Sequence, residues 1–290
     1  MTTSPALAAE TFSIGGDLPV HRLGYGTMRL VGDGAWGDPA DPAEARRVLR
    51  RAVELGVNLI DTADAYGPEI AERLIAEALH PYPAGLVIAT KGGVTRQGPS
   101  KTEYVGRAGY LIQCVEMSLR RLKLERIELY QLHRIDPRTS LEESLGALRQ
   151  MQDQGKIRHI GLSEVTPAQI QEAQKIVKIV TVQNRYSLAD RRHEDALAWC
   201  EQRRIGFMPW YPIVAGKILK EDHPSARTLG TLATRHGATV AQILLAWLLH
   251  RSPVMLPIPG TSKVAHLEEN IAAAELKLSA EDFAEIDSAA

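Results

Sequence analysis

Four polar residues of types that can move a proton follow short apolar runs in this chain. Asp61 and Tyr66 follow one run, Lys91 ends the next, and His133 ends a third. Taken singly, each residue type more often caps a helix, packs its ring or carries a solvated charge. Together at three strand ends, an acid, a phenol, an amine and an imidazole predict a site that transfers a proton.

Short apolar runs alternate along the chain with longer segments of helical period, which is the pattern of a parallel sheet with crossover helices. The expected strands are 21–27, 58–61, 86–91, 127–133, 157–163, 179–184, 206–210 and 255–258. The helices expected between them include 42–55, 69–79, 108–121, 141–154, 167–175 and 191–203. Asp41 and Ser140 are natural N-caps for two of these helices, and Gly56 and Gly155 follow their last residues.

Eight strand–helix units in about 250 residues match a (β/α)8 barrel. Residues 1–290 are predicted to form one such domain, with a core from about 20 to 275. Residues 11–21 alternate in polarity around Gly15 and Gly16, which predicts a hairpin that closes the bottom of the barrel. Active sites of such barrels form at the C-terminal ends of the strands, where the four polar residues would lie.

A doubly wound sheet is the structural alternative, because Gly32, Gly34 and Gly37 satisfy a GxGxxG pattern. In a dinucleotide-binding fingerprint the third glycine opens a helix, whereas here the helix signal begins only at Asp41. The segment is therefore predicted to be a flexible loop over the pocket, with Trp36 as a lid residue.

Composition excludes several classes of protein. The 290 residues are 44% hydrophobic and 24% charged, enough for a sizeable core. A formal net charge of −1 gives no electrostatic footprint for nucleic acid or an anionic membrane. Cys114 and Cys200 lack the spacing of a disulfide pair or of metal ligands. The first residues lack a signal-peptide pattern. The longest apolar stretch, 243–249, is too short to span a bilayer. A cytoplasmic protein is expected, with the monomer favoured.

The order and spacing of the motifs resemble the aldo-keto reductase superfamily from about Leu23 to about Asn270. The resemblance lies in Asp61-x-Ala-x-x-Tyr66-Gly67, in Lys91 after the next strand and in Leu132-His133 after the one that follows. Further matching segments are 24–27, 155–163, 182–186, 257–262 and 267–270. Each segment is a weak signal, but their common order is specific.

The resemblance implies NAD(P)H-dependent reduction of aldehydes or ketones to alcohols, and the residue chemistry agrees. Hydride addition to a carbonyl creates an alkoxide that must be protonated, and Tyr66 is the natural acid. A free phenol is a weak acid at neutral pH, and a nearby ammonium strengthens it, which Lys91 would do. Asp61 would hold Lys91 by an ion pair, and His133 would orient the carbonyl by a hydrogen bond.

The resemblance also implies a cofactor site. Ser163 and Gln183 match residues that hold the carboxamide, Trp210 matches the ring that stacks on the nicotinamide, and Gly216 with Lys217 matches a pyrophosphate loop. Core packing is the alternative role of Trp210. Phosphate binding by residues 260–263 is physically sensible at a helix start. The full set of expected cofactor residues is Gly26, Thr27, Met28, Asp61, Ser163, Glu164, Gln183, Trp210, Tyr211, Pro212, Ile213, Gly216, Lys217, Gly260, Thr261, Ser262, Lys263, His266, Glu269 and Asn270.

Two residues depart from the family pattern. Glu164 replaces a common Asn, so either its carboxyl accepts the amide hydrogens of the cofactor or that contact differs. His266 replaces an Arg that grips the 2'-phosphate, which weakens NADP preference unless Ser262 and Lys263 compensate. NADPH is still expected as the donor, with NADH as the alternative.

Substrate identity depends on loops, which the sequence specifies only in part. The expected substrate-lining residues are Met28, Trp36, Tyr66, His133 and Arg134. Arg134 would attract an anionic group, unless it is an ordinary surface arginine. Small aldehydes, including aromatic or pyridoxal-like ones, are the expected substrates in an open pocket.

Two other functions are compatible with the barrel. A nucleotide-sensing subunit of a membrane protein could keep all four polar residues. A metal-dependent hydrolase would need ligands such as His133, Asp64 and Asp136, which lack a recognisable ligand spacing, so no metal is expected. Asp64 and Asp136 are predicted to be loop or cap residues.

Overall fold

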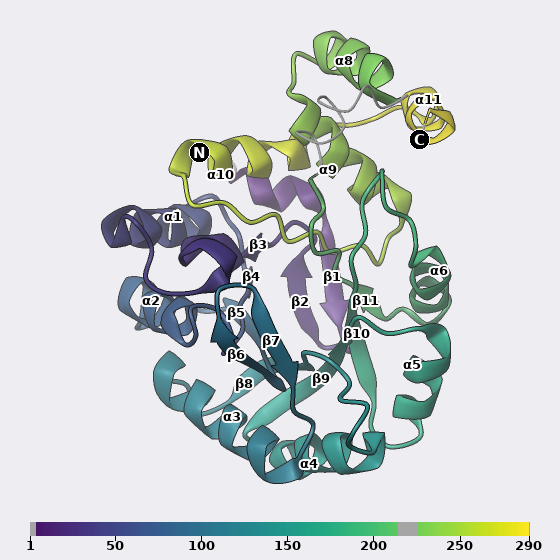
Figure 1. The fold of residues 1–290 in the computed structure, drawn as a ribbon. Coiled ribbons are helices and arrows are strands. Elements are labelled where there is room, and N and C mark those ends of the chain that lie inside the picture. The colour runs from purple at the N-terminus through teal and green to yellow at the C-terminus, as the bar shows by residue number, and fades with distance from the viewer. Residues whose placement is uncertain (1–3, 214–224, 290) are drawn as a thin grey trace.

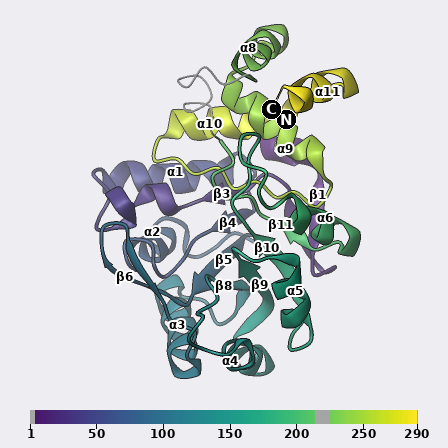
Figure 2. The same ribbon diagram turned by 45° about the vertical axis from the view of Figure 1, so that its right-hand side comes forward.

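A parallel sheet curled into a barrel positions every polar residue considered above. The computed structural model describes residues 4–213 and 225–289. In spatial order the strands are β11 (Gly206–Phe207), β10 (Ile179–Gln183), β9 (Ile157–Ser163), β8 (Ile127–Leu132), β5 (Val87–Gly92), β4 (Leu59–Asp61) and β3 (Tyr25–Gly26). Figures 1 and 2 show this sheet inside a ring of helices. The structure confirms the predicted (β/α)8 barrel.

The eighth strand position is irregular, although the segment predicted there does close the barrel. On one side Phe207 N donates to Val254 O (2.8 Å) and Leu256 N donates to Phe207 O (2.7 Å). On the other side Gly24 N donates to Pro257 O (2.9 Å). Residues 255–258 form only an isolated bridge instead of the expected strand. Prolines at 257 and 259 lack the amide hydrogen that a regular ladder needs, which explains the difference.

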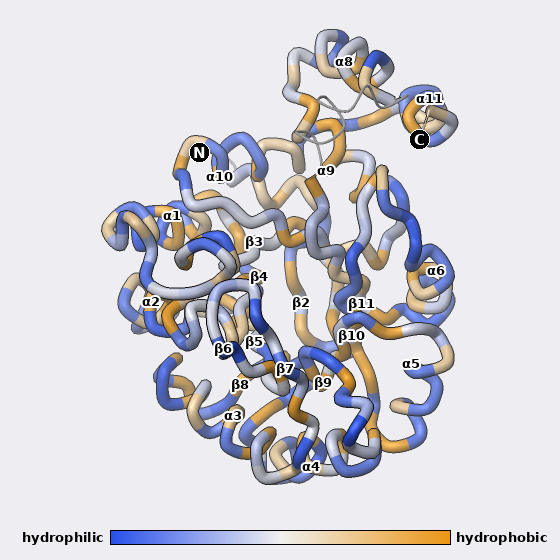
Figure 3. The backbone as a smooth tube through the Cα atoms, viewed as in Figure 1, coloured by the Kyte–Doolittle hydropathy of each residue, from blue (hydrophilic) through white to orange (hydrophobic). Residues whose placement is uncertain are grey.

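Helices surround the sheet. They are α1 (Pro42–Glu54), α2 (Ile70–Leu79), α3 (Ala108–Leu122), α4 (Leu141–Asp153), α5 (Pro167–Gln174), α6 (Glu194–Arg203), α8 (Ser225–His236), α9 (Val240–Arg251), α10 (Val264–Ala272) and α11 (Ala280–Ser288). Of these, α8 and α11 pack on α9 outside the ring (Figure 1). Short 3-10 helices are η1 (Pro5–Ala9), η2 (Met28–Leu30), η3 (Asp33–Ala35) and η4 (Ala273–Glu275). The predicted caps Asp41 and Ser140 accept amide hydrogens at the starts of α1 and α4. Figure 3 shows hydrophilic and hydrophobic positions alternating along these helices. None of the helices in the described part of the chain is long and apolar enough to cross a membrane.

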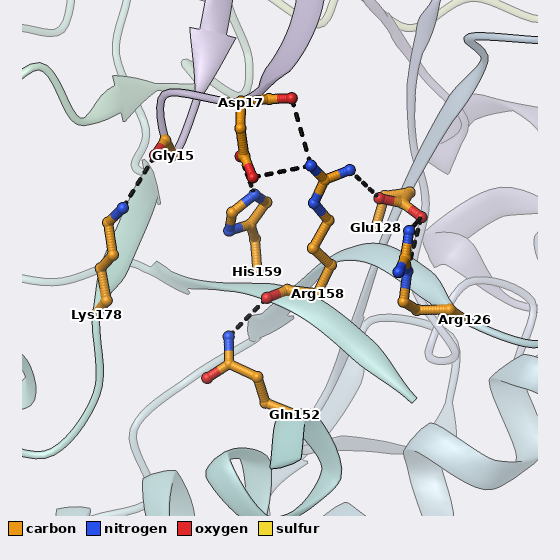
Figure 4. Close-up of polar contacts among 8 residues, drawn as sticks. All are labelled: Gly15, Asp17, Arg126, Glu128, Gln152, Arg158, His159 and Lys178. Carbon is orange, nitrogen blue, oxygen red and sulfur yellow. Dashed lines mark hydrogen bonds and ion pairs between the residues drawn. The ribbon is translucent and has the colours of Figure 1, made fainter. Parts of the chain in front are cut away.

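The N-terminal hairpin of β1 (Thr11–Ile14) and β2 (Leu18–His21) lies against the amino ends of the barrel strands, as predicted. At its turn Asp17 accepts a hydrogen bond from Arg158 (2.8 Å) and lies 2.7 Å from His159 Nε2, both on β9 (Figure 4). These contacts hold the pKa of Asp17 below its usual value. Gly15 has φ +67°, and a Cβ there would lie 2.5 Å from the His159 ring, so only glycine fits this close approach.

A second hairpin, which the sequence analysis did not predict, follows β5 at the opposite end of the barrel. It pairs β6 (Val94–Gly98) with β7 (Lys101–Tyr104) in antiparallel register. Ser100 N donates to Gly34 O (3.0 Å), so the hairpin also fixes the loop that contains η3. That loop precedes a helix that begins only at Pro42, so its glycines do not open a helix as a dinucleotide fingerprint requires.

Candidate active site

The four predicted catalytic residues meet at the C-terminal mouth of the barrel. Asp61, Tyr66 and His133 line a cavity of about 240 Å³, and Lys91 is fully buried beside them. Asp61 ends β4, Lys91 is the penultimate residue of β5, and His133 directly follows β8. Parallel neighbouring strands bring these ends together because β4 pairs with β5 and β5 pairs with β8.

Lys91 is the centre of the cluster. Its Nζ donates to Asp61 Oδ2 at 2.7 Å, to Thr62 O at 2.8 Å and to Tyr66 Oη at 3.2 Å. Burial opposes the charge on Lys91, but Asp61 and Tyr66 outweigh burial and raise its pKa above the usual value. A buried ammonium with three oxygen partners is thus retained, and it is aimed at the phenol.

Asp61 is held on its other oxygen as well. Gln183 Nε2 donates to Asp61 Oδ1 at 2.8 Å, and Gln131 Nε2 approaches the same oxygen at 3.2 Å. Gln183 was expected to bind a cofactor amide, whereas its amide nitrogen here contacts Asp61. The sequence analysis did not single out Gln131, although its alternation within β8 places it inside the barrel.

His133 lies beside the phenol as a neutral imidazole. Its ring and that of Tyr66 meet edge to face with centroids 5.9 Å apart. Burial, together with the positive charges of Lys91, Arg134 and Arg96, lowers the pKa of His133 well below its usual value. Nδ1 is buried without a hydrogen-bond partner in the described residues. A buried N–H without an acceptor is rarer than an unused acceptor, which favours the tautomer that carries its proton on Nε2.

Glu164 turns away from the cavity. Its backbone has φ +56°, in the left-handed region that Asn tolerates better than Glu. Glu164 Oε1 accepts hydrogen bonds from Arg185 N (2.6 Å) and from Trp210 Nε1 (2.7 Å). The carboxyl therefore anchors the indole of Trp210, a cavity-lining ring, from outside. Arg134, by contrast, donates to Ser163 Oγ at 2.9 Å within the wall.

Several of the other predicted residues line the same cavity. These are Gly26, Met28, Arg134, Ser163, Gln183, Trp210, Tyr211, Pro212, Ile213 and Gly260. A second, open cavity of about 700 Å³ shares Met28, Arg29, Arg96, Trp210 and Tyr211 with the first and extends to Ser262 and Lys263. The two cavities together make an elongated channel that starts at the four polar residues.

The remaining predicted residues do not line either of these cavities. Trp36 is 38% exposed and its segment bridges to Gly67, so it is not positioned as a lid in this structure. Thr27 is buried and donates to Asp61 O, Thr261 O accepts from Tyr25, and Glu269 accepts from Thr239. His266 is exposed on α10, and Asn270 is buried on the same helix. Gly216 and Lys217 lie outside the described residues.

The β6–β7 hairpin adds cavity-lining residues that the sequence analysis missed, among them Arg96, Thr102 and Tyr104. Gly98-Pro99-Ser100 between two alternating polar segments is a turn signal that could have revealed the hairpin.

Asp64 and Asp136 have local roles, as predicted. Asp136 caps the loop after β8 by accepting from Gly106 N and Arg138 N. Asp64 is buried beside Cys114. Within residues 4–213 and 225–289 no group of three or more His, Cys, Asp or Glu side chains could hold a metal ion.

Asp64 makes a pH-dependent contribution to stability that a variant can expose. Burial, reinforced by Glu72, raises the pKa of Asp64 from 3.8 to about 7. Each unit of pKa shift corresponds to ~1.4 kcal/mol. Ionisation of Asp64 in the folded state therefore lowers the free energy of unfolding by at most about 4 kcal/mol. Because the pKa is raised in the folded state, the contribution of Asp64 to the free energy of unfolding of the wild type falls as the pH rises from about 4 to 7. Compared with the wild type, Asp64→Asn is therefore expected to be more stable at pH 8 than it is at pH 5. Denaturant unfolding of both proteins at the two pH values measures this.

Asp136→Asn is the matched control for this experiment. Burial opposes the charge of Asp136, but hydrogen bonds from the backbone N–H groups of Arg138 and Gly106 and from the Arg138 side chain outweigh burial and hold the pKa of Asp136 below its usual value. The Asp136 contribution is present above about pH 4 and is lost only in acid, so its loss should cost about the same at pH 5 and pH 8. A free-energy difference between wild type and Asp64→Asn that does not change with pH would contradict the expectation.

Comparison with known proteins identifies the family. Residues 22–290 match the model of the aldo/keto reductase family. An uncharacterized oxidoreductase of Schizosaccharomyces pombe is 48% identical over 94% of this chain and 87% of its own length. Pyridoxine 4-dehydrogenase of Escherichia coli is 42% identical over 97% of this chain and 98% of its own length.

Solved structures agree with the sequence relatives. A thermostable aldo-keto reductase in complex with the inhibitor epalrestat superposes with a TM-score of 0.84 at 32% identity, covering 97% of this chain and 99% of that one. An aldo-keto reductase of Klebsiella pneumoniae in complex with NADPH gives a TM-score of 0.82 at 27% identity, covering 96% and 94%. The chain belongs to the aldo/keto reductase family and is an oxidoreductase, which confirms the resemblance stated from its motifs.

Proposed function

We propose that this protein reduces aldehydes or ketones to alcohols with NADPH, using Tyr66 as the general acid. The observation that carries the proposal is the buried Lys91, which donates to both Asp61 and Tyr66 at the base of a cavity that also exposes His133. Tyr66 as the acid, Lys91 as the cation that stabilises its phenolate and His133 as the group that orients the carbonyl would then act together on a substrate bound in this cavity.

The residues present fit a nicotinamide dinucleotide. The two adjoining cavities run from Asp61 past Trp210 to Ser262 and Lys263, which suits an elongated ligand with an aromatic head near Trp210 and an anionic group near Lys263. Gly26 and Gly260 approach so closely that a Cβ on Gly260 would lie 2.8 Å from Gly26 O, so backbone alone forms this part of the wall. The related enzyme from Klebsiella pneumoniae that binds NADPH supports the same assignment.

When bound, the nicotinamide supplies the hydride that reaches the carbonyl carbon. Tyr66 gives its phenolic proton to the carbonyl oxygen as the negative charge develops there. Lys91 stabilises the resulting phenolate through its hydrogen bond to Tyr66 Oη, and Asp61 keeps the ammonium in place. Neutral His133 donates from Nε2 to the carbonyl oxygen and orients that oxygen between the imidazole and the phenol of Tyr66.

The preference between NADPH and NADH is testable because side chains of opposite charge line the end of the second cavity, where we expect the adenosine of the cofactor. Lys263 lines the second cavity, but Glu44 Oε1 accepts the hydrogen of Val264 N at the start of α10, and His266 is exposed on that helix. NADPH is expected to show the lower KM, since Lys263 and Ser262 favour a phosphate. Glu44→Gln should lower the KM for NADPH more than that for NADH, because it removes a like charge. Steady-state assays in which NADH matches or exceeds NADPH would overturn the preference.

A nucleotide-sensing subunit is the alternative to a free-standing enzyme. A panel of aldehydes assayed by NADPH oxidation at 340 nm distinguishes the two. Turnover of any aldehyde that depends on Tyr66 supports the reductase. Nucleotide binding without turnover across the panel would support the sensor and refute the proposal.

A further inference from the structure

The β6–β7 hairpin places a cation on the wall of the cavity. Arg96 lies on β6 and lines the same cavity as Tyr66 and His133. It is near enough to His133 to help lower the pKa of that imidazole. Neither Thr102 nor Tyr104, which line the cavity from the facing strand β7, brings a negative charge.

Two backbone carbonyls fix the guanidinium of Arg96. Its Nε donates to Ala65 O at 2.6 Å, and its Nη1 donates to Gly34 O at 3.1 Å. A guanidinium has five N–H groups, so further donors remain after these two bonds are made. The group is held in place before any ligand arrives, which lowers the entropic cost of binding.

Arg96 has no carboxylate partner in the described part of the chain. It is half-buried, and burial lowers its pKa below the usual value, although an arginine stays charged. Arg29 and Arg134 also line the cavity, whereas Asp61, the one carboxylate among its described lining residues, is paired with Lys91. The described part of the cavity wall therefore carries an excess of positive charge, which favours the binding of an anion.

Arg96 lies where the two cavities join, since it lines both of them. Its Nε bond to Ala65 O places it next to the loop that carries Tyr66, on the wall of the cavity that also contains His133. Ser262 and Lys263 line only the second cavity, just before α10. With the cofactor phosphates at that end of the channel, an anion beside Arg96 and Tyr66 would belong to the substrate.

We propose that Arg96 binds an anionic group of the substrate, so that the preferred substrates are small carbonyl compounds carrying a carboxylate or a phosphate. A guanidinium binds either group through paired, charge-assisted hydrogen bonds. This inference rests on the proposed function and specifies its substrate class. It also differs from the sequence-based expectation, which assigned the anionic group to Arg134.

Matched pairs of substrates test the inference. We would measure kcat/KM with NADPH for 4-carboxybenzaldehyde against its uncharged methyl ester, and for glyceraldehyde 3-phosphate against glyceraldehyde. The wild-type enzyme is expected to favour at least one anionic member by about ten-fold or more, mainly through KM. Arg96→Met should reduce that ratio to about one, and Arg96→Lys should retain part of it, because an ammonium keeps the charge but not the fork.

Arg134→Met is the matched comparison, since it removes the same charge from the same cavity. Arg134 Nη1 already donates to His133 O and Ser163 Oγ, so the ratio between anionic and neutral substrates should fall much less in this variant than in Arg96→Met. Because each ratio is taken within one variant, a general effect of Arg96 on the Tyr66 loop cancels. If Arg96→Met does not fold, the ratio of kcat/KM for anionic against neutral substrates in the wild type and in Arg96→Lys still tests the inference.

Three results would overturn the inference. These are a wild-type ratio near one for both pairs, a ratio that Arg96→Met leaves unchanged, and an Arg96→Met effect confined to the KM for NADPH. The proposed function fails separately, if the wild-type enzyme reduces none of the four compounds nor any other aldehyde.

Discussion

Tyr66→Phe is expected to reduce kcat for aldehyde reduction by roughly 10²- to 10⁴-fold, the usual range for losing a general acid. Phenylalanine keeps the ring that meets His133 edge to face and removes only the hydroxyl that Lys91 contacts at 3.2 Å. The alkoxide then has no positioned proton donor. Stopped-flow measurement of NADPH oxidation in a single turnover separates this chemical step from product release.

Nucleotide affinity serves as the control for the Tyr66 variant. NADPH titrations should give nearly the same Kd for wild type and Tyr66→Phe, since the phenol contributes to chemistry rather than to dinucleotide binding. Tyr82→Phe is the matched substitution away from the cavity, where the hydroxyl only donates to Leu122 O. A Tyr66→Phe enzyme within ten-fold of the wild-type rate would rule out the phenol as the acid.

Lys91→Met is expected to impair both catalysis and stability. Removing one partner of a buried ion pair costs about 3–5 kcal/mol, because the other charge is left without compensation. Lys91 is fully buried and Asp61 is 2% exposed, so solvent cannot replace the lost contact. Denaturant unfolding measures the stability loss, and kcat should fall by roughly 10²-fold or more because the Tyr66 phenolate loses its stabilising cation.

Combining Lys91→Met with Asp61→Asn separates the two effects. A neutral amide at position 61 removes the uncompensated charge, so the double variant should recover part of the stability lost in Lys91→Met. It should recover no activity, since the ammonium beside Tyr66 is still absent. Additive losses of stability in the two single variants would contradict the coupling of Asp61 and Lys91 that the 2.7 Å contact indicates.

Local patterns were sufficient to predict how the barrel delivers its polar residues. Asp61, Lys91 and His133 each lie at or just beyond the end of an apolar run, and parallel strands align such ends at one edge. The structure brings them into contact with Tyr66, while their separate roles stay predictions that the Tyr66 and Lys91 variants test. The boundaries of the closing segment 255–258 were less predictable, since its prolines weaken a regular ladder.

Contacts between distant segments were beyond the reach of sequence patterns. Trp36 was expected over the pocket, but backbone bonds between residues 35–37 and Gly67 hold its segment at the side. Gln183 lines the cavity, where its contact with a cofactor amide stays a prediction, and the structure adds a bond from its Nε2 to Asp61 that the sequence analysis did not foresee. Glu164 turns outward because of a left-handed backbone conformation that its residue type does not suggest.

The sequence by itself determined the barrel and the four polar residues that meet at its mouth, because strand ends and motif order are local properties of the chain. Only the tertiary structure decided what surrounds them. The β6–β7 hairpin folds over the mouth through the contact of Ser100 with Gly34 and thereby brings Arg96 to the cavity wall. Such long-range packing depends on the simultaneous placement of several elements, and it sets the charge of the pocket that a substrate meets.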